Sequence, residues 1–227
     1  MANFEDITRI IEAKKTGDKK LFFYNSKNEK VTTESFVKEF YELQEYKVMR
    51  AEVNFWQAMF CLVFFEEIYS MNVYPMNDIP IDLFQSEFFY QARKNIIDEK
   101  YNYIKNCNLP EFINSQILKH GDSKNRLFYM NLPTYKVDNI AYFKTEIVQE
   151  FVKKINQNLF CEIVYKIARN PNDNRAGLPD FIIWNNDILE FIEVKRIDEK
   201  LRTPQGIWIE YLLSMGTPVY IVRVKDI

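Results

Sequence analysis

Three residues near the end of the chain have the types and the spacing of a hydrolytic site. Asp180 follows a proline, and Glu193 and Lys195 lie two positions apart in an apolar segment. Residues two apart on a strand face the same side, and the turn-forming residues 185–187 fold Asp180 back toward this pair. Two carboxylates are hard oxygen ligands suited to Mg²⁺ or Mn²⁺, and an ammonium can orient or deprotonate a metal-bound water. The pattern is typical of phosphodiester hydrolysis, with the carbonyl of Val194 as a further candidate metal ligand.

The same pattern has a structural interpretation. A carboxylate near a lysine on a strand is commonly a solvated surface pair that contributes little stability. The Pro-Asp pair, the turn and the apolar strands around it favour a site here. Unpaired charges on a buried strand are costly, so they are expected where they serve a function.

The elements that position these residues change character along the chain. Apolar residues recur at helical spacing in the first two thirds, which predicts helices over Thr33–Leu43, Arg50–Tyr69, Gln85–Ile104 and Thr145–Ile155. A turn with Pro75 and Pro80 follows the second of these, and residues 119–143 are expected to be irregular.

A strand pattern begins at about residue 177. Phe181–Trp184 and Leu189–Lys195 are predicted to form an antiparallel hairpin. A helix then opens at Thr203-Pro204, with Thr203 as N-cap, and ends at Gly216. Pro218–Val224 is the last strand, and a strand, a helix and a strand imply parallel pairing with a right-handed crossover.

The composition limits the class of protein. A chain of 227 residues with 47% hydrophobic and 16% aromatic residues can bury a core, which excludes general disorder. The formal net charge is −2, so a nucleic-acid enzyme of this composition must gather its positive charge on one face or use bound cations. The 3 widely spaced cysteines predict reduced thiols, and the one histidine, His120, is expected on a surface loop. The polar N-terminus and the shortness of every apolar run predict a soluble, intracellular, cytoplasmic protein, nuclear if eukaryotic.

Taken together, the motifs resemble the VRR-NUC branch of the PD-(D/E)XK nucleases. The signature of that branch is G-L-P-D, an apolar strand, E-V-K, then Q-x-x-W-x-x-x-L, a glycine and a V-x-V strand. This sequence supplies Gly177-Leu178-Pro179-Asp180, Glu193-Val194-Lys195, Gln205, Trp208, Leu212, Gly216 and Val222-Arg223-Val224. The resemblance implies an α/β, restriction-endonuclease-like core, a mixed sheet flanked by helices, with a helical N-terminal half. It predicts a helical extension over residues 1–45 and a nuclease domain over 46–227, with a helical insertion at about 70–160.

The resemblance extends upstream to the Fanconi-associated nuclease subgroup. A glutamate there opens an apolar helix, as Glu52 does here, and Pro80-Ile81-Asp82-Leu83 and Arg93 match the segment that follows. By this resemblance Glu52 is a fourth catalytic residue and a metal ligand; a favourable anion in a first helical turn is the alternative.

Further site residues are implied by the same subgroup. Gln205 matches its active-site glutamine, whereas Trp208 is expected in the core. Arg175 and Lys200 match basic positions that contact phosphate, with solvated surface charges as the alternative. Arg196-Ile197 stands where the subgroup has Gly-Pro, so the loop after the catalytic strand must differ.

The implied function is a structure-specific nuclease, dependent on Mg²⁺ or Mn²⁺, that cuts branched or flapped DNA near 5′ flaps. A homodimeric four-way junction resolvase and a catalytically silent DNA-binding module are the alternatives. The long stretch between Glu52 and Asp180 is unlike minimal, dimeric members of the family, which favours a monomer.

Overall fold

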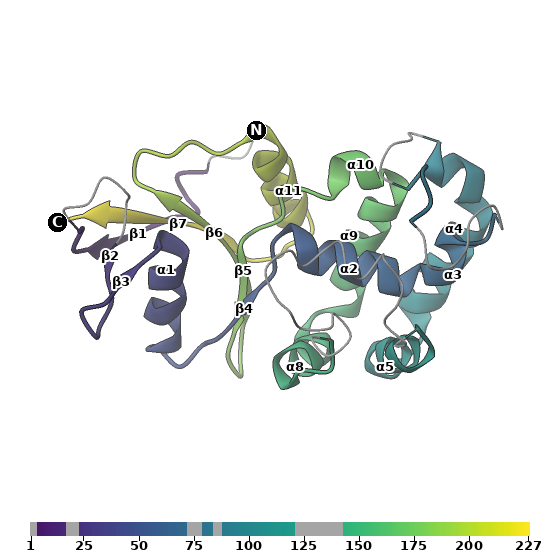
Figure 1. Ribbon diagram of the computed structural model, residues 1–227, viewed down its shortest axis with the longest axis horizontal. Coiled ribbons are helices and arrows are strands. Elements are labelled where there is room, and N and C mark those ends of the chain that lie inside the picture. The colour runs from purple at the N-terminus through teal and green to yellow at the C-terminus, as the bar shows by residue number, and fades with distance from the viewer. Residues whose placement is uncertain (1–3, 17–22, 72–78, 84–87, 121–142) are drawn as a thin grey trace. The chain divides into compact units, whose positions relative to one another are not determined.

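The computed structural model describes residues 4–16, 23–71, 79–83, 88–120 and 143–227, in two compact units (Figure 1). Unit 1 comprises Met1–Glu52 and Gly177–Ile227, and unit 2 comprises Val53–Ala176. Two segments far apart in sequence therefore build unit 1. It contains Glu52, Asp180, Glu193, Lys195 and Gln205.

A five-stranded mixed sheet forms the core of unit 1. In spatial order the strands are β1 (Thr8–Ala13), β7 (Val219–Asp226), β6 (Leu189–Arg196), β5 (Phe181–Trp184) and β4 (Lys47–Arg50). β1, β7 and β6 run parallel, and β5 is antiparallel to both β6 and β4. β6 is thus the central strand, and its six interior residues are all buried.

Two helices cover opposite faces of this sheet. Helix α1 (Thr33–Glu42) contributes Val37 and Tyr41 to an apolar cluster that includes Ile192 and Val194. Helix α11 (Thr203–Ser214) lies on the other face, where Gln205 contacts Glu193 of β6. Because side chains alternate along a strand, Glu193 and Lys195 lie on the α11 face. A short hairpin of β2 (Phe23–Tyr24) and β3 (Lys30–Val31) completes the described part of unit 1.

Within the described residues of unit 2, every regular element is a helix. Its helices are α2 (Val53–Val63), α3 (Phe65–Ile68), α4 (Phe89–Asn106), α5 (Leu109–His120), α8 (Glu146–Lys154), α9 (Gln157–Arg169) and α10 (Pro171–Asn174). The core is rich in aromatic rings: Trp56 of α2 lies 5.9 Å from Phe151 of α8 and 6.0 Å from Phe160 of α9, measured between ring centroids. No helix in the described ranges is both long and apolar enough to span a membrane.

The expected fold class is confirmed, since a mixed sheet is flanked by helices and a helical segment is inserted between its strands. The helices predicted over 33–43 and 145–155, the hairpin of β5 and β6, and the parallel pairing of β6 with β7 are also found. The turn after Pro80 is present, where the Leu83 N–H donates to the Pro80 carbonyl at 3.0 Å. Pro75 and Gln85, which the predicted turn and helix included, lie outside the described residues.

The helical character predicted for residues 1–45 is wrong for much of that segment. Strands β1, β2 and β3 lie there beside a single described helix, α1. β1 is a short edge strand that is stabilised by its pairing with β7. This pairing involves a distant part of the chain, so the spacing of apolar side chains within β1 does not predict a strand. The domain boundary at residue 45 stays a prediction.

Three local predictions are also corrected. The helix predicted to begin at Arg50 begins at Val53, because Arg50 pairs with Phe181 as the end of β4, and it breaks at Phe64 before α3. His120 ends helix α5 instead of lying in a loop, and its ring stacks on Phe65. The N-cap of α11 is Arg202, one residue before the predicted Thr203.

Candidate active site

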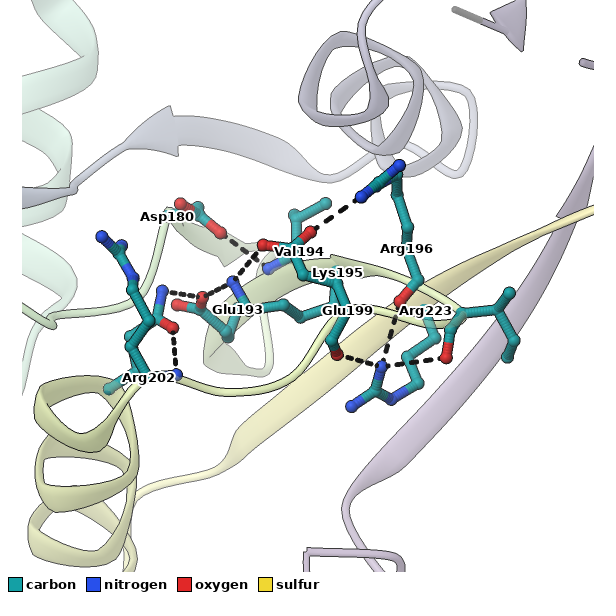
Figure 2. Close-up of polar contacts among 10 residues, drawn as sticks. Asp180, Glu193, Val194, Lys195, Arg196, Glu199, Arg202 and Arg223 are labelled. Carbon is teal, nitrogen blue, oxygen red and sulfur yellow. Dashed lines mark hydrogen bonds and ion pairs between the residues drawn. The ribbon is translucent and has the colours of Figure 1, made fainter. Parts of the chain in front are cut away.

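Asp180 is held at the open end of the β5–β6 hairpin (Figure 2). Its carboxylate Oδ2 accepts the Val194 N–H at 2.7 Å, and its backbone carbonyl accepts the Ala51 N–H at 2.9 Å. These two bonds continue the pairing of β5 with β6 on one side and with β4 on the other. Asp180 therefore has a fixed position beside the catalytic strand predicted from the sequence.

Glu193 is the buried centre of the site. Its side chain has 0% relative exposure, and Oε1 accepts two hydrogen bonds, from Lys195 Nζ at 2.6 Å and from Gln205 Nε2. The other oxygen, Oε2, is buried and has no hydrogen-bond partner among the residues that the structure describes. A buried carboxylate oxygen without a partner is costly, which indicates that a bound group completes the site.

The carboxyl groups of Glu193 and Asp180 are both difficult to ionise. Burial, followed by the charge of Asp180, raises the pKa of Glu193 to about 8, against the opposing effects of Lys195 and Arg202. Burial raises the pKa of Asp180 to about 6, although the Val194 N–H and Lys195 act in the opposite direction. Two such carboxyl groups side by side are stabilised as anions by a cation between them.

Gln205 connects helix α11 to the site. It lies in the first turn of the helix, with 3% relative exposure, and its Oε1 accepts the Arg202 N–H at 3.0 Å while Nε2 donates to Glu193. Trp208, one turn later, is 1% exposed and packs in the core as predicted. The helix thus places one polar side chain on the site and uses the next turn for packing.

Glu52 lies beside the site but is engaged elsewhere. It follows β4, whose Arg50 pairs with Phe181, and its negative charge contributes to the raised pKa of Asp180. Its carboxylate Oε1, however, accepts from Nε of Arg50 and pairs with Nη2 of the same side chain. Throughout the described ranges, no three Asp, Glu, His or Cys side chains converge as a metal cluster. The role of Glu52 as a metal ligand stays a prediction, and the Arg50 contacts both fall on one of its two carboxylate oxygens.

The remaining predicted site residues are placed without a direct test of their roles. Lys200 is exposed on the loop between β6 and α11. Arg175 caps the C-terminal end of α10 in unit 2. The N–H of Val194 binds Asp180, while the role of its carbonyl as a metal ligand stays a prediction, as do the phosphate contacts of Arg175 and Lys200.

Three charged residues near the site were missed from the sequence. Arg50 pairs with Glu52, Arg202 lowers the pKa of Glu193, and Glu34 of α1 raises the pKa of Asp180. A pocket of about 180 Å³ lies between the start of α1 and the end of β6, lined by Thr32–Glu34, Val194–Arg196 and Glu199. Of these three residues, only Arg50 could have been inferred from the sequence, because it lies two positions before Glu52. Glu34 lies near the site only because α1 packs on the sheet.

The donor set fits a hard divalent cation. Asp180 and Glu193 present carboxylate oxygens, including the unpartnered Oε2, and no described histidine or cysteine belongs to the site. Oxygen donors of this kind select Mg²⁺ or Mn²⁺ over softer metals.

Comparison with protein-family models gives a match to the VRR-NUC domain over residues 113–226. The Fanconi-associated nuclease 1 homolog of Caenorhabditis elegans is 22% identical over 183 residues, which cover 74% of this chain and 20% of that protein. The homolog from Dictyostelium discoideum is 24% identical over 200 residues, covering 78% of this chain and 17% of that protein. The chain thus spans about a fifth of the length of these curated relatives.

Comparison with solved structures gives the same fold. The crystal structure of paFAN1 bound to 2nt 5′flap DNA with gap matches with a TM-score of 0.75 at 18% sequence identity. The match covers 100% of this chain and 39% of that one. A second structure, of paFAN1 bound to 1nt 5′flap DNA with gap, matches with a TM-score of 0.74.

Proposed function

This chain belongs to the VRR-NUC domain family, and from that membership we propose that it is a metal-dependent nuclease that hydrolyses phosphodiester bonds in DNA. One observation carries the proposal: Glu193 is fully buried with an unpartnered oxygen, between the Lys195 ammonium and Asp180. A decayed, purely structural site would have no reason to retain such a costly group.

We propose that the substrate is branched DNA, in particular DNA with a 5′ flap. Two facts support this: relatives are named as Fanconi-associated nuclease 1 homologs, and the matching crystal structures hold 5′flap DNA. A monomer remains our prediction for the acting form.

Each side chain has a distinct part in the proposed reaction. Asp180 and Glu193 would hold the Mg²⁺ or Mn²⁺, which when bound polarises the phosphoryl oxygen and makes its water more acidic. Lys195 directs its ammonium at Glu193 and can orient the attacking water or stabilise charge on the phosphate. Gln205 holds Glu193 in its rotamer from the other side.

Cleavage of labelled DNA tests the proposal. A 5′ flap, a 3′ flap, a four-way junction, a duplex and a single strand would be incubated with Mg²⁺, with Mn²⁺ or with EDTA. We expect cutting of the 5′ flap with either metal, and a loss of at least about a hundredfold in Asp180→Asn and Glu193→Gln. Asp187→Asn, at the exposed turn of the same hairpin, is the matched control and should cut normally.

The panel also separates the alternatives. Symmetrical cutting of the four-way junction by a protein that elutes as a dimer would support a resolvase in place of a flap nuclease. Binding of DNA without cutting, by folded wild-type protein on every substrate, would favour the silent module.

A further inference from the structure

Arg223 of β7 is a cation beside the site to which no role has been assigned. It is the register partner of Lys195 in the parallel β6–β7 pair, and adjacent strands lie about 5 Å apart. Figure 2 shows its Nη1 donating to three backbone carbonyls, those of Arg196 at 3.0 Å, Ile197 at 3.3 Å and Glu199 at 2.8 Å. One nitrogen of Arg223 therefore holds the start of the loop that follows the catalytic strand.

The rest of this guanidinium has no partner within the described part of the chain. Nε and Nη2 make no hydrogen bond there, and no described carboxylate lies within salt-bridge distance of Arg223. Other arginines of the protein are paired: Arg9 with Glu190, Arg50 with Glu52 and Arg93 with Asp82. Arg223 is thus a half-buried cation with a fixed orientation, and the N–H groups of its Nε and Nη2 remain available as donors.

We propose that Arg223 binds a phosphate of the nucleic acid that occupies the site, through its Nε and Nη2 edge. The proposal deepens the nuclease function and rests on it. A planar guanidinium held in place by three carbonyls loses little freedom on binding, and its fork matches two phosphate oxygens. An acidic chain, with a formal net charge of −2, also needs local positive charge where DNA binds.

A purely structural role makes a different prediction. In that case Arg223 acts only by holding the loop that carries Lys200, the predicted phosphate contact, and all effects of its removal pass through Lys200. The two roles are separated by the number of phosphate contacts, which the salt dependence of DNA binding measures.

The experiment measures the affinity for a fluorescent 5′-flap DNA in EDTA, from 50 to 200 mM KCl, with gel analysis that the DNA stays intact. We expect Arg223→Gln and Lys200→Gln each to reduce the slope of log affinity against log salt by about 0.9, and the double variant by about twice that. Lys38→Gln removes one exposed charge from helix α1, on the opposite face of the sheet, and should leave the slope unchanged.

A second variant keeps the test decisive if Arg223→Gln fails to fold. Arg223→Lys keeps the positive charge and can donate to carbonyls of the loop but lacks the planar fork that matches two phosphate oxygens, so its melting temperature should stay close to that of the wild type. Its DNA affinity should still fall about tenfold, the effect of one charge-assisted hydrogen bond.

The outcomes distinguish this inference from the proposed function. A double variant with the slope of Lys200→Gln alone, or Arg223→Lys with wild-type affinity, would overturn the phosphate contact while leaving the nuclease intact. The predicted slopes in a protein that cuts no DNA would sustain the contact and refute the nuclease. Wild-type protein that binds no DNA in EDTA and cuts none with Mg²⁺ or Mn²⁺ would refute both.

Discussion

At the scale of single residues, the site is built from carboxyl groups whose ionisation the fold opposes. Glu193 has no exposed surface, and Asp180 is next to it with its pKa raised to about 6. A free aspartate has a pKa of about 4, so the folded chain binds this proton more tightly than the unfolded chain does. The contribution of Asp180 to the stability of the metal-free protein therefore falls as the pH rises from about 4 through 6.

The variant Asp180→Asn tests the predicted direction of this pH dependence. Asparagine stays neutral and still accepts the Val194 N–H, so it should remove the cost of ionisation without removing the bond. In EDTA at pH 8, we expect the variant to melt about 2–4 °C above the wild type, which corresponds to ~1 kcal/mol in a chain of this size. At pH 4 the two should melt together, because the wild-type carboxyl is then protonated.

Differential scanning calorimetry at the two pH values provides the measurement. Asp187→Asn, exposed in the turn, should show no difference that depends on pH. Equal melting of wild type and Asp180→Asn at pH 8 would show that burial does not destabilise the Asp180 anion.

At the scale of elements, the approach of two backbone segments sets the geometry around Asp180. Gly177 has φ +97°, and a Cβ at this position would lie 2.5 Å from both the carbonyl carbon and the carbonyl oxygen of Pro204, in the first turn of α11. Only glycine allows the chain entering β5 to pass this close to the helix that carries Gln205. The glycine of the motif therefore couples β5 to α11.

Gly177→Ala should be far more damaging than Gly216→Ala. Gly216, just after α11, also has a positive φ of +71°, but its hypothetical Cβ has no described atom within 4 Å apart from those of its chain neighbours. We expect a loss of about 2–4 kcal/mol at Gly177, from strain and overlap together, against about 1 kcal/mol at Gly216 from strain alone.

Urea unfolding measures both losses, and a cleavage assay accompanies it. DNA cutting should be impaired in Gly177→Ala even where the protein is folded, and preserved in Gly216→Ala. Equal losses of stability in the two variants would mean that the contact with Pro204 does not constrain the fold.

At the scale of the whole molecule, the N-terminal segment is part of unit 1, not an appendage. β1 pairs with β7 along Thr8–Ala13. From β1, Arg9 reaches over the Tyr220 ring, 3.3 Å from its centroid, to bind both oxygens of the buried Glu190, at 3.0 and 3.3 Å. The segment thereby closes one edge of the sheet and neutralises a charge on its central strand.

Removal of residues 1–16 should therefore unfold unit 1 or severely weaken it. The deletion exposes an edge of β7 and leaves Glu190 buried without Arg9, which by itself costs about 3 kcal/mol or more. Circular dichroism during urea unfolding is the measurement, with Lys14→Gln, an exposed change in the same segment, as the neutral control. If the truncated protein had the same unfolding midpoint as the full chain, the N-terminal segment would be an extension that does not stabilise unit 1, and this prediction would be wrong.

The sequence by itself determined the local parts of this protein. The period of two places Glu193 and Lys195 on one face of β6, and the turn-forming residues 185–187 return Asp180 to them. The same local chemistry predicted helix α11 and the parallel last strand, although the helix ends at Ser214, with Met215 as its C-cap, instead of at the predicted Gly216. These features depend on residues close together in the sequence, so the spacing of residue types along the chain is enough to predict them.

Only the tertiary structure decided which distant segments join that local frame. β1 and β4 are short edge strands stabilised by the partners they pair with. This is why β1 lies within the segment predicted as a helical extension, and why Arg50, the last residue of β4, was predicted to begin a helix. The pairing of Glu52 with Arg50, the contribution of Glu34 and the three carbonyls around Arg223 depend on side chains and loops that meet only after folding. Burial is also decided by the tertiary structure. It raises the pKa of Glu193, so that a bound cation is needed to stabilise the ionised carboxylate.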